Sequence, residues 1–180
     1  MNNIREVVFD LETQLWSSEV EGGFSNIPAF GMSLAVTWDD DNDFKVWLEK
    51  DVSNLVRHLK EADKVIGFNS VRFDYGVLSA YVPNIHELLD NKSFDIFTDL
   101  ESRLGFRLSL ESISSATLGK SKSGMAQDAI KWFRQGQIDK LIFYCRTDVE
   151  LTRDIYRFGQ EHGFVCYPQM GRLVELPVEW

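Results

Sequence analysis

Short apolar runs separated by polar turns fill the first half of the chain, and longer amphipathic runs follow. Four of the short runs predict β-strands. These are residues 5–9, 31–38, 44–48 and 64–68. The polar residues 39–43 lie between the second and third runs, so this pair is expected to form a hairpin.

Apolar residues at helical spacing predict six helices and, after them, a short closing hairpin. The helices are residues 51–62, 72–80, 94–104, 109–117, 125–135 and 137–161, and the closing strands are residues 164–167 and 172–176. Asp51 is expected to cap the first helix, and Gly136 and Gly163 are expected to end the last two. This order of elements predicts an α/β fold in which a mixed β-sheet is flanked by helices on both faces.

The composition narrows the class of protein. A chain of 180 residues with 44% hydrophobic content suits one packed domain, which we expect to span residues 1–180. No apolar stretch approaches the roughly 20 residues of a membrane span, and the first residues lack the apolar core of a signal peptide. Two cysteines, Cys145 and Cys166, do not make a disulfide framework and are expected to be small buried residues. We therefore expect a cytoplasmic protein with no membrane association.

The net charge of −9 argues against a broad nucleic-acid-binding surface. It does not exclude an enzyme that binds the end of a strand through metal ions, because some of its acidic residues would then be metal ligands. Local positive charge is found at Lys120, Lys122, Lys131, Arg134, Arg146 and Arg153. Solvated surface and phosphate contact explain each of these residues equally well.

The first of three acidic motifs is the pair Asp10 and Glu12, directly after the first apolar run. Residues two apart on a strand share a face, so both carboxylates can point into one cavity. Hard divalent cations such as Mg²⁺ and Mn²⁺ take oxygen ligands of this kind. A strand that merely ends in acidic turn residues is the alternative.

The second motif contains Asn69, Phe73 and Asp74, on the expected turn from strand to helix after residues 64–68. Loops at strand ends are where α/β proteins place their sites. Asp74 would supply a carboxylate, Asn69 an amide, and Phe73 an apolar surface beneath the site. A turn-forming Asn, a core Phe and an Asp at a helix N-terminus are the alternative.

The third motif is the pair Tyr144 and Asp148 in the last long helix. Their spacing of four residues places them on one helix face. Asp148 can reach a metal ion, while the Tyr144 hydroxyl can orient an attacking water. A free phenol titrates near ~10, so Tyr144 is a poor general base at neutral pH. A surface Asp beside a half-buried Tyr is the alternative.

Four carboxylates meet at one centre only if the fold brings the three motifs together. Such a concentration of negative charge is offset by bound cations. The sequence therefore favours a two-metal site, and two-metal sites cleave phosphodiesters.

In this order the motifs resemble the DEDD superfamily of 3′–5′ exonucleases, which have a ribonuclease H-like fold. They read Asp-x-Glu at residues 10–12, Asn-x-x-x-Phe-Asp at residues 69–74 and Tyr-x-x-x-Asp at residues 144–148. Residues 94–100 and 108–111 also look like the branch related to the proofreading domain of family B DNA polymerases.

The chain looks like the tyrosine variant of this superfamily. The histidine variant carries His five residues before the last Asp, and Phe143 stands at that position here, followed by Tyr144.

The resemblance implies a role for each motif residue. Asp10, Glu12 and Asp148 would hold the catalytic metal, Asp10 would bridge to a second metal, and Asp74 would contribute nearby. The metals would be two Mg²⁺ or Mn²⁺ ions. The terminal nucleotide would contact the backbone around Leu11 and Thr13, with Asn69 and Phe73 as further substrate contacts.

The function that this implies is the removal of nucleotides from the 3′ end of nucleic acid, as in DNA proofreading or repair. Single-stranded DNA is the favoured substrate, and RNA remains an alternative. Two other functions stay open: a nucleic-acid-binding module without turnover, and a ribonuclease H-like endonuclease. A free-standing nuclease and a part of a larger replication or repair assembly also both stay open.

Overall fold

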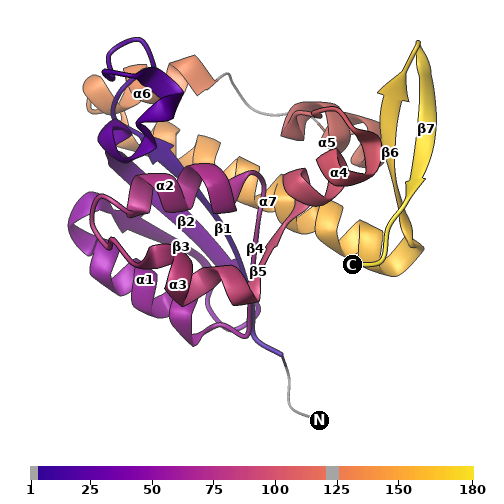
Figure 1. The fold of residues 1–180 in the computed structure, drawn as a ribbon, viewed down its shortest axis with the longest axis horizontal. Helices are drawn as coiled ribbons and strands as arrows, with labels where there is room; N and C mark the ends of the chain where they lie inside the picture. The colour runs from indigo at the N-terminus through magenta and orange to yellow at the C-terminus, as the bar shows by residue number, and fades with distance from the viewer. Residues whose placement is uncertain (1–3, 121–125) are drawn as a thin grey trace.

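The computed structural model describes residues 4–120 and 126–180. Five strands form one sheet in the order β3-β2-β1-β4-β5 (Figure 1). They are β1 (Glu6–Thr13), β2 (Met32–Asp39), β3 (Asp43–Leu48), β4 (Lys64–Gly67) and β5 (Ser93–Asp95). The central strand β1 pairs antiparallel with β2 and parallel with β4, so the sheet is mixed, as predicted.

Helices and a second, two-stranded sheet complete the fold. The helices are α1 (Val52–Glu61), α2 (Tyr75–Leu78), α3 (Ile85–Leu89), α4 (Ile96–Leu104), α5 (Leu110–Leu118), α6 (Ala126–Arg134) and α7 (Ile138–His162). Strands β6 (Phe164–Gln169) and β7 (Arg172–Pro177) form the predicted closing hairpin. The short helical turns are η1 (Gly23–Ser25), η2 (Ile27–Phe30), η3 (Glu49–Asp51), η4 (Ser70–Asp74) and η5 (Asp90–Lys92). Within residues 4–120 and 126–180, no helix has both the length and the apolar character of a membrane span.

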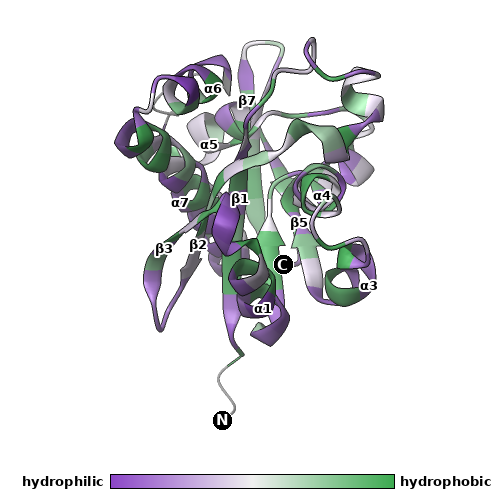
Figure 2. Ribbon diagram, turned by 90° about the vertical axis from the view of Figure 1, so that its left-hand side faces the viewer, coloured by the Kyte–Doolittle hydropathy of each residue, from purple (hydrophilic) through white to green (hydrophobic). Residues whose placement is uncertain are grey.

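Two hydrophobic cores lie on opposite faces of the sheet because side chains alternate along each strand. From β1, Val8 packs with buried residues of α4, α5 and α7. Its neighbours Val7 and Phe9 pack instead with buried residues of α1, α2 and α3. Figure 2 shows hydrophobic residues gathered where these strands and helices meet. The predicted α/β sheet with helices on both faces is confirmed.

The prediction of one helix over residues 94–104 is wrong at its start. Residues 93–95 form β5, which pairs in parallel with β4, and the helix begins only at Ile96. Asp95 stands at the junction and caps α4, because its carboxylate accepts from the backbone N–H of Thr98. A three-residue edge strand is too short to show the alternation of apolar and polar residues that predicts a strand.

Segment 69–80 also differs from the single helix predicted over residues 72–80. Asn69 adopts a left-handed conformation with φ of 61°, the wide π-helical turn η4 follows, and α2 ends at Leu78. Asp51 does precede α1 as predicted, but its carboxylate accepts from the backbone N–H of Leu48, outside the helix, at 3.3 Å. Helix α3 was not predicted. Asp10 and Glu12 lie within β1, which extends to Thr13, rather than beyond its end.

Gly67, the last residue of β4, gives a first test of how the fold supports segment 69–74. A Cβ atom built at Gly67 would overlap the Oγ and Cβ of Ser70, a buried residue of η4. We expect Gly67→Ala to lower the free energy of unfolding by about 1–3 kcal/mol, as overpacking does, measured by urea denaturation. The double variant Gly67→Ala/Ser70→Gly should recover part of this loss because it removes the overlapping atoms. Equal stability of Gly67→Ala and the wild type would contradict this packing.

Candidate active site

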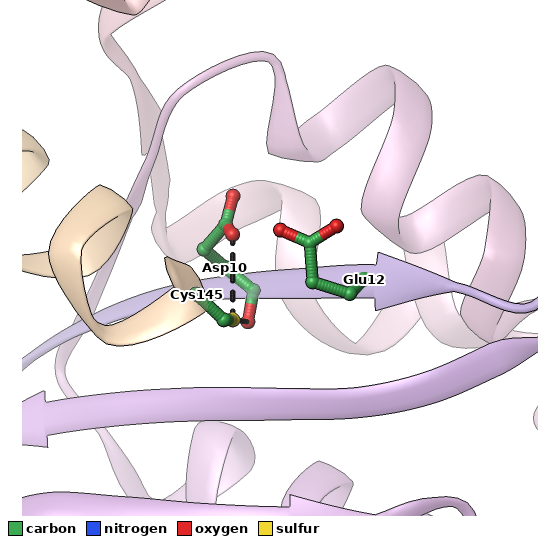
Figure 3. A group of neighbouring side chains, drawn as sticks. All are labelled: Asp10, Glu12 and Cys145. Carbon is green, nitrogen blue, oxygen red and sulfur yellow. Dashed lines mark hydrogen bonds between the residues drawn. The ribbon is translucent and has the colours of Figure 1, made fainter. Parts of the chain in front are cut away.

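Asp10 and Glu12 project to the same side of β1 (Figure 3). They pair with Val36 and Leu34 of β2, and the register of the two strands shifts between Glu12 and Thr13. Such an irregularity redirects side chains at the end of a strand and is common next to active sites. The sequence prediction that both carboxylates share one face agrees with this placement.

Cys145 of α7 lies against Asp10 and is fully buried. Its sulfur is 3.5 Å from both the Oδ2 atom and the carbonyl oxygen of Asp10, so the thiol donates to Asp10. One ligand atom from each of Asp10, Glu12 and Cys145 lies within 4.8 Å of the others. Cys145 is a small buried residue, as predicted from the sequence, but its contact with Asp10 was not predicted. Cys166 is only half-buried, so the same expectation is wrong for that residue.

Asp74 approaches the same strand from η4. It is 3% exposed, and its Oδ1 atom accepts from the backbone N–H of Leu11 at 3.0 Å. Burial raises the pKa of Asp74 well above the ordinary carboxyl range, and the charge of Asp10 raises it further. The hydrogen bond from Leu11 acts in the opposite direction but does not outweigh them. In the metal-free protein, burial and the charge of Asp10 therefore disfavour ionisation of Asp74.

Tyr144 and Asp148 reach this region from α7, and both are buried. Burial raises the pKa of Tyr144, and the charges of Asp148, Glu12 and Asp10 raise it further. The pKa of Tyr144 thus responds to carboxylates of both β1 and α7. Because its pKa is raised, Tyr144 keeps its proton at neutral pH and can act as a hydrogen-bonding group but not as a base.

Asp95 supports the turn that leads to Asp74, a role that was not predicted from the sequence. Its two carboxylate oxygens accept from the backbone N–H groups of Asn69, at 2.8 Å, and Val71, at 3.0 Å. Burial raises its pKa, while these hydrogen bonds lower it. Asp95 thus fixes the turn that presents Asn69 and leads to Asp74. The available signal was its place in the stretch of residues 94–100 that resembles the exonucleases.

A cavity of about 340 Å³ opens beside the acidic residues. All four predicted substrate residues line it, together with one carboxylate of the acidic pair. They are Leu11, Thr13, Asn69, Phe73 and Glu12. Acidic site and cavity are therefore contiguous along the end of β1.

Aromatic side chains that the sequence analysis did not select also line the cavity. Trp16, Phe24 and Phe30 come from the segment between β1 and β2, where no helix or strand was predicted. Phe30 packs edge-on against Phe73, with ring centroids 5.6 Å apart, and is stacked with Phe24 at 5.5 Å. The cavity therefore offers flat apolar walls of the kind on which nucleobases stack.

The basic residues considered as phosphate contacts make contacts within the protein. Lys120 and Arg153 pair with Asp154, Lys131 with Asp128 and Arg134 with Glu19. The guanidinium of Arg146 lies over the ring of Phe44, 4.1 Å from its centroid. Lys122 lies outside the described residues.

Comparison with known proteins identifies the fold. No family model matches the chain, and no curated protein matches it. Among solved structures, the family B DNA polymerase from the hyperthermophilic archaeon Pyrobaculum calidifontis superposes with a TM-score of 0.68 and 11% sequence identity. The match covers 87% of this chain and 24% of the polymerase, so the chain spans about a quarter of that protein's length. Together with the strand order, this similarity shows the ribonuclease H-like α/β fold that the motifs implied.

Removing the charge of Asp74 should stabilise the metal-free protein. The folded state binds the Asp74 proton more tightly than the unfolded chain does, so this carboxyl lowers the free energy of unfolding as pH rises above its ordinary pKa of 3.8. Asp74→Asn keeps an oxygen that can accept from Leu11. We expect it to raise the thermal midpoint in EDTA at pH 8, and to raise it less at pH 5.

The control for this prediction is Asp41→Asn, which removes the same charge at an exposed residue of the β2–β3 turn. Its thermal midpoint should match that of the wild type at both pH values. Added Mn²⁺ should narrow the gap between wild type and Asp74→Asn, since a cation offsets the repulsion that the variant lacks. A thermal midpoint for Asp74→Asn at or below the wild-type value in EDTA at pH 8 would show that this repulsion is absent.

Proposed function

We propose that this chain is a metal-dependent 3′–5′ exonuclease that hydrolyses phosphodiester bonds at the 3′ end of nucleic acid by a two-metal-ion mechanism. The observation that carries the proposal is the junction of an acidic cluster with an aromatic cavity at one end of β1. Asp10, Glu12 and Leu11 belong to this junction, and Asp74 and Asp148 add carboxylates from two other elements.

The donor set fits divalent cations. Carboxylate oxygens are the ligands that Mg²⁺ and Mn²⁺ prefer, and the raised pKa of Asp74 reflects its burial and then the negative charge of Asp10, which a cation would offset. Asp10, Glu12, Asp74 and Asp148 would hold the two ions. When bound, such ions neutralise developing charge on phosphate and lower the pKa of the attacking water.

The residues of the chain would then divide the remaining tasks. Tyr144, which stays protonated, orients the attacking water through its hydroxyl. Leu11, Thr13 and Asn69 border the terminal nucleotide, and Phe73 offers a stacking surface for its base. Because the cavity adjoins Glu12, a nucleotide held there presents its phosphodiester to the acidic cluster.

Similarity to a DNA polymerase supports a nucleic-acid substrate, although at 11% identity it shows the fold alone. We propose single-stranded DNA as the favoured substrate, with RNA as the alternative, and residues 1–180 as one exonuclease domain. An unpaired end suits an aromatic cavity because its base is free to leave the stack.

Asp10→Asn should abolish metal-dependent degradation. We expect wild-type protein with Mn²⁺ to shorten a 5′-labelled single-stranded oligonucleotide stepwise from its free 3′ end, and to leave a 3′-blocked one intact. Asp10→Asn should show a loss of about 10³-fold or more, because it removes a charge from the proposed catalytic centre. The variant Asp41→Asn is the matched control, and gel analysis of the product ladder is the measurement.

The same digestion separates the alternatives. Cutting of closed circular single strands would favour an endonuclease, since an end-dependent enzyme leaves circles intact. Binding of labelled strands without cleavage under Mg²⁺ or Mn²⁺ would favour a module without turnover. Undiminished degradation by Asp10→Asn would reject the proposed site.

Tyr144→Phe should lower kcat roughly tenfold while KM stays near the wild-type value. The substitution removes one hydrogen bond to the attacking water, worth about 1–2 kcal/mol, and leaves the cavity intact. Because the phenol is not the base, the pH dependence of kcat should keep its shape. The kcat–pH profiles of the wild type and Tyr144→Phe, compared between pH 6 and 9, test this, and loss of a basic limb in Tyr144→Phe would contradict the orienting role.

A further inference from the structure

Trp16 forms part of the cavity wall but lies on an irregular segment rather than on a strand or helix. A wall built on such a segment keeps its orientation only if other contacts hold it. Two charged residues supply these contacts, Glu19 from the same segment and Arg134 from the end of α6.

Arg134 makes three contacts with this segment. Its guanidinium lies over the indole ring of Trp16, 4.2 Å from the ring centroid. Its Nη2 atom donates to a carboxylate oxygen of Glu19 at 2.5 Å and, more weakly, to the carbonyl oxygen of Gln14 at 3.5 Å. Arg134 therefore contacts the ring of Trp16 and the backbone two residues before it.

Glu19 closes the network. The oxygen that accepts from Arg134 also accepts from the backbone N–H of Trp16 at 2.9 Å. The Trp16 backbone, the Glu19 carboxylate, the Arg134 guanidinium and the Trp16 ring thus form a closed loop of contacts. The hydrogen bonds fix the main chain of Trp16, and the guanidinium over the ring restricts the rotation of its indole.

Helix α6 also lines the cavity directly. Ile130 and Gln127 of the same helix face it, and Ile130 is 7% exposed. Helix α6, which carries Arg134, is therefore anchored at the cavity by its buried residue Ile130.

We propose that Arg134 and Glu19 are positioning residues that hold the Trp16 indole as a stacking surface for an unpaired terminal base. This inference rests on the proposed function and adds a determinant of substrate binding to it. The planar guanidinium suits this role better than the ammonium group of Lys, which can keep the ion pair but cannot stack in the same way. Arg134 thus contributes to nucleic-acid binding through the Trp16 indole that it orients, without contacting the strand itself.

A fluorescent base tests the inference without turnover. The probe is a single-stranded oligonucleotide that ends in 2-aminopurine, whose emission falls when it stacks on an aromatic ring, bound to the protein in EDTA. We expect wild-type protein to quench the terminal base and Trp16→Ala to lose this quenching. Arg134→Ala and Glu19→Gln should lose a large part of it, and Arg134→Lys should fall between Arg134→Ala and the wild type.

The control and a double-mutant cycle separate positioning from folding. Lys131→Ala removes another basic residue of α6, paired with Asp128, and should quench like the wild type. Adding Arg134→Ala to Trp16→Ala should change nothing further, because Arg134 acts through the indole. Under turnover, Arg134→Ala should raise KM about two- to fivefold, the size of a partly exposed cation–π contact, and leave kcat near the wild-type value.

The outcomes distinguish the two proposals. Full quenching by Arg134→Ala, or no quenching by the wild type, would overturn the positioning role of Arg134. The positioning role would also be overturned if adding Arg134→Ala to Trp16→Ala reduced the quenching further, by as much as Arg134→Ala does alone. Quenching that follows the expected order in a protein that degrades no strand would uphold the positioning role and reject the exonuclease.

Discussion

Burial of Asp74 beside the charge of Asp10 is the constraint that the rest of this structure must withstand. Asp74 is almost fully buried, and the largest charge effect on its pKa comes from Asp10, so ionising it in the metal-free protein is unfavourable. A loose scaffold would relieve the repulsion by moving the side chains apart. Here, each acidic residue is fixed by an element packed into one of two cores. The carboxylates are therefore kept close together at a cost in stability, which is common at functional sites.

Two elements, β1 and η4, carry three of these carboxylates. Asp10 and Glu12 are carried by the central strand, which has a packed core on each face. Asp74 is held by the backbone N–H of Leu11, and its turn is tied to Asp95 through two further backbone N–H groups. The donors to Asp74 and Asp95 are neutral backbone N–H groups, so they position these carboxylates without cancelling their charge. Cations remain the natural means of cancelling it.

The sequence was sufficient where a site residue depends on local geometry. The shared face of Asp10 and Glu12 follows from the strand period, and the shared face of Tyr144 and Asp148 follows from the helix period. It was insufficient where placement depends on pairing between distant segments. The strand β5 exists because residues 93–95 pair with β4, and the contact of Cys145 with Asp10 spans 135 residues. Neither leaves a local pattern to read.

The acidic character of the chain also agrees with recognition of a strand end. Of the basic residues considered for phosphate contact, those in the described ranges are engaged by carboxylates or aromatic rings, as Lys120 and Arg146 are. On the proposed function, counterion release along a backbone would add little affinity. Binding would then come from stacking in the cavity and from cations in the acidic cluster. Both act on the last nucleotides alone, so affinity and cleavage would concentrate at the end of a strand and not along its length.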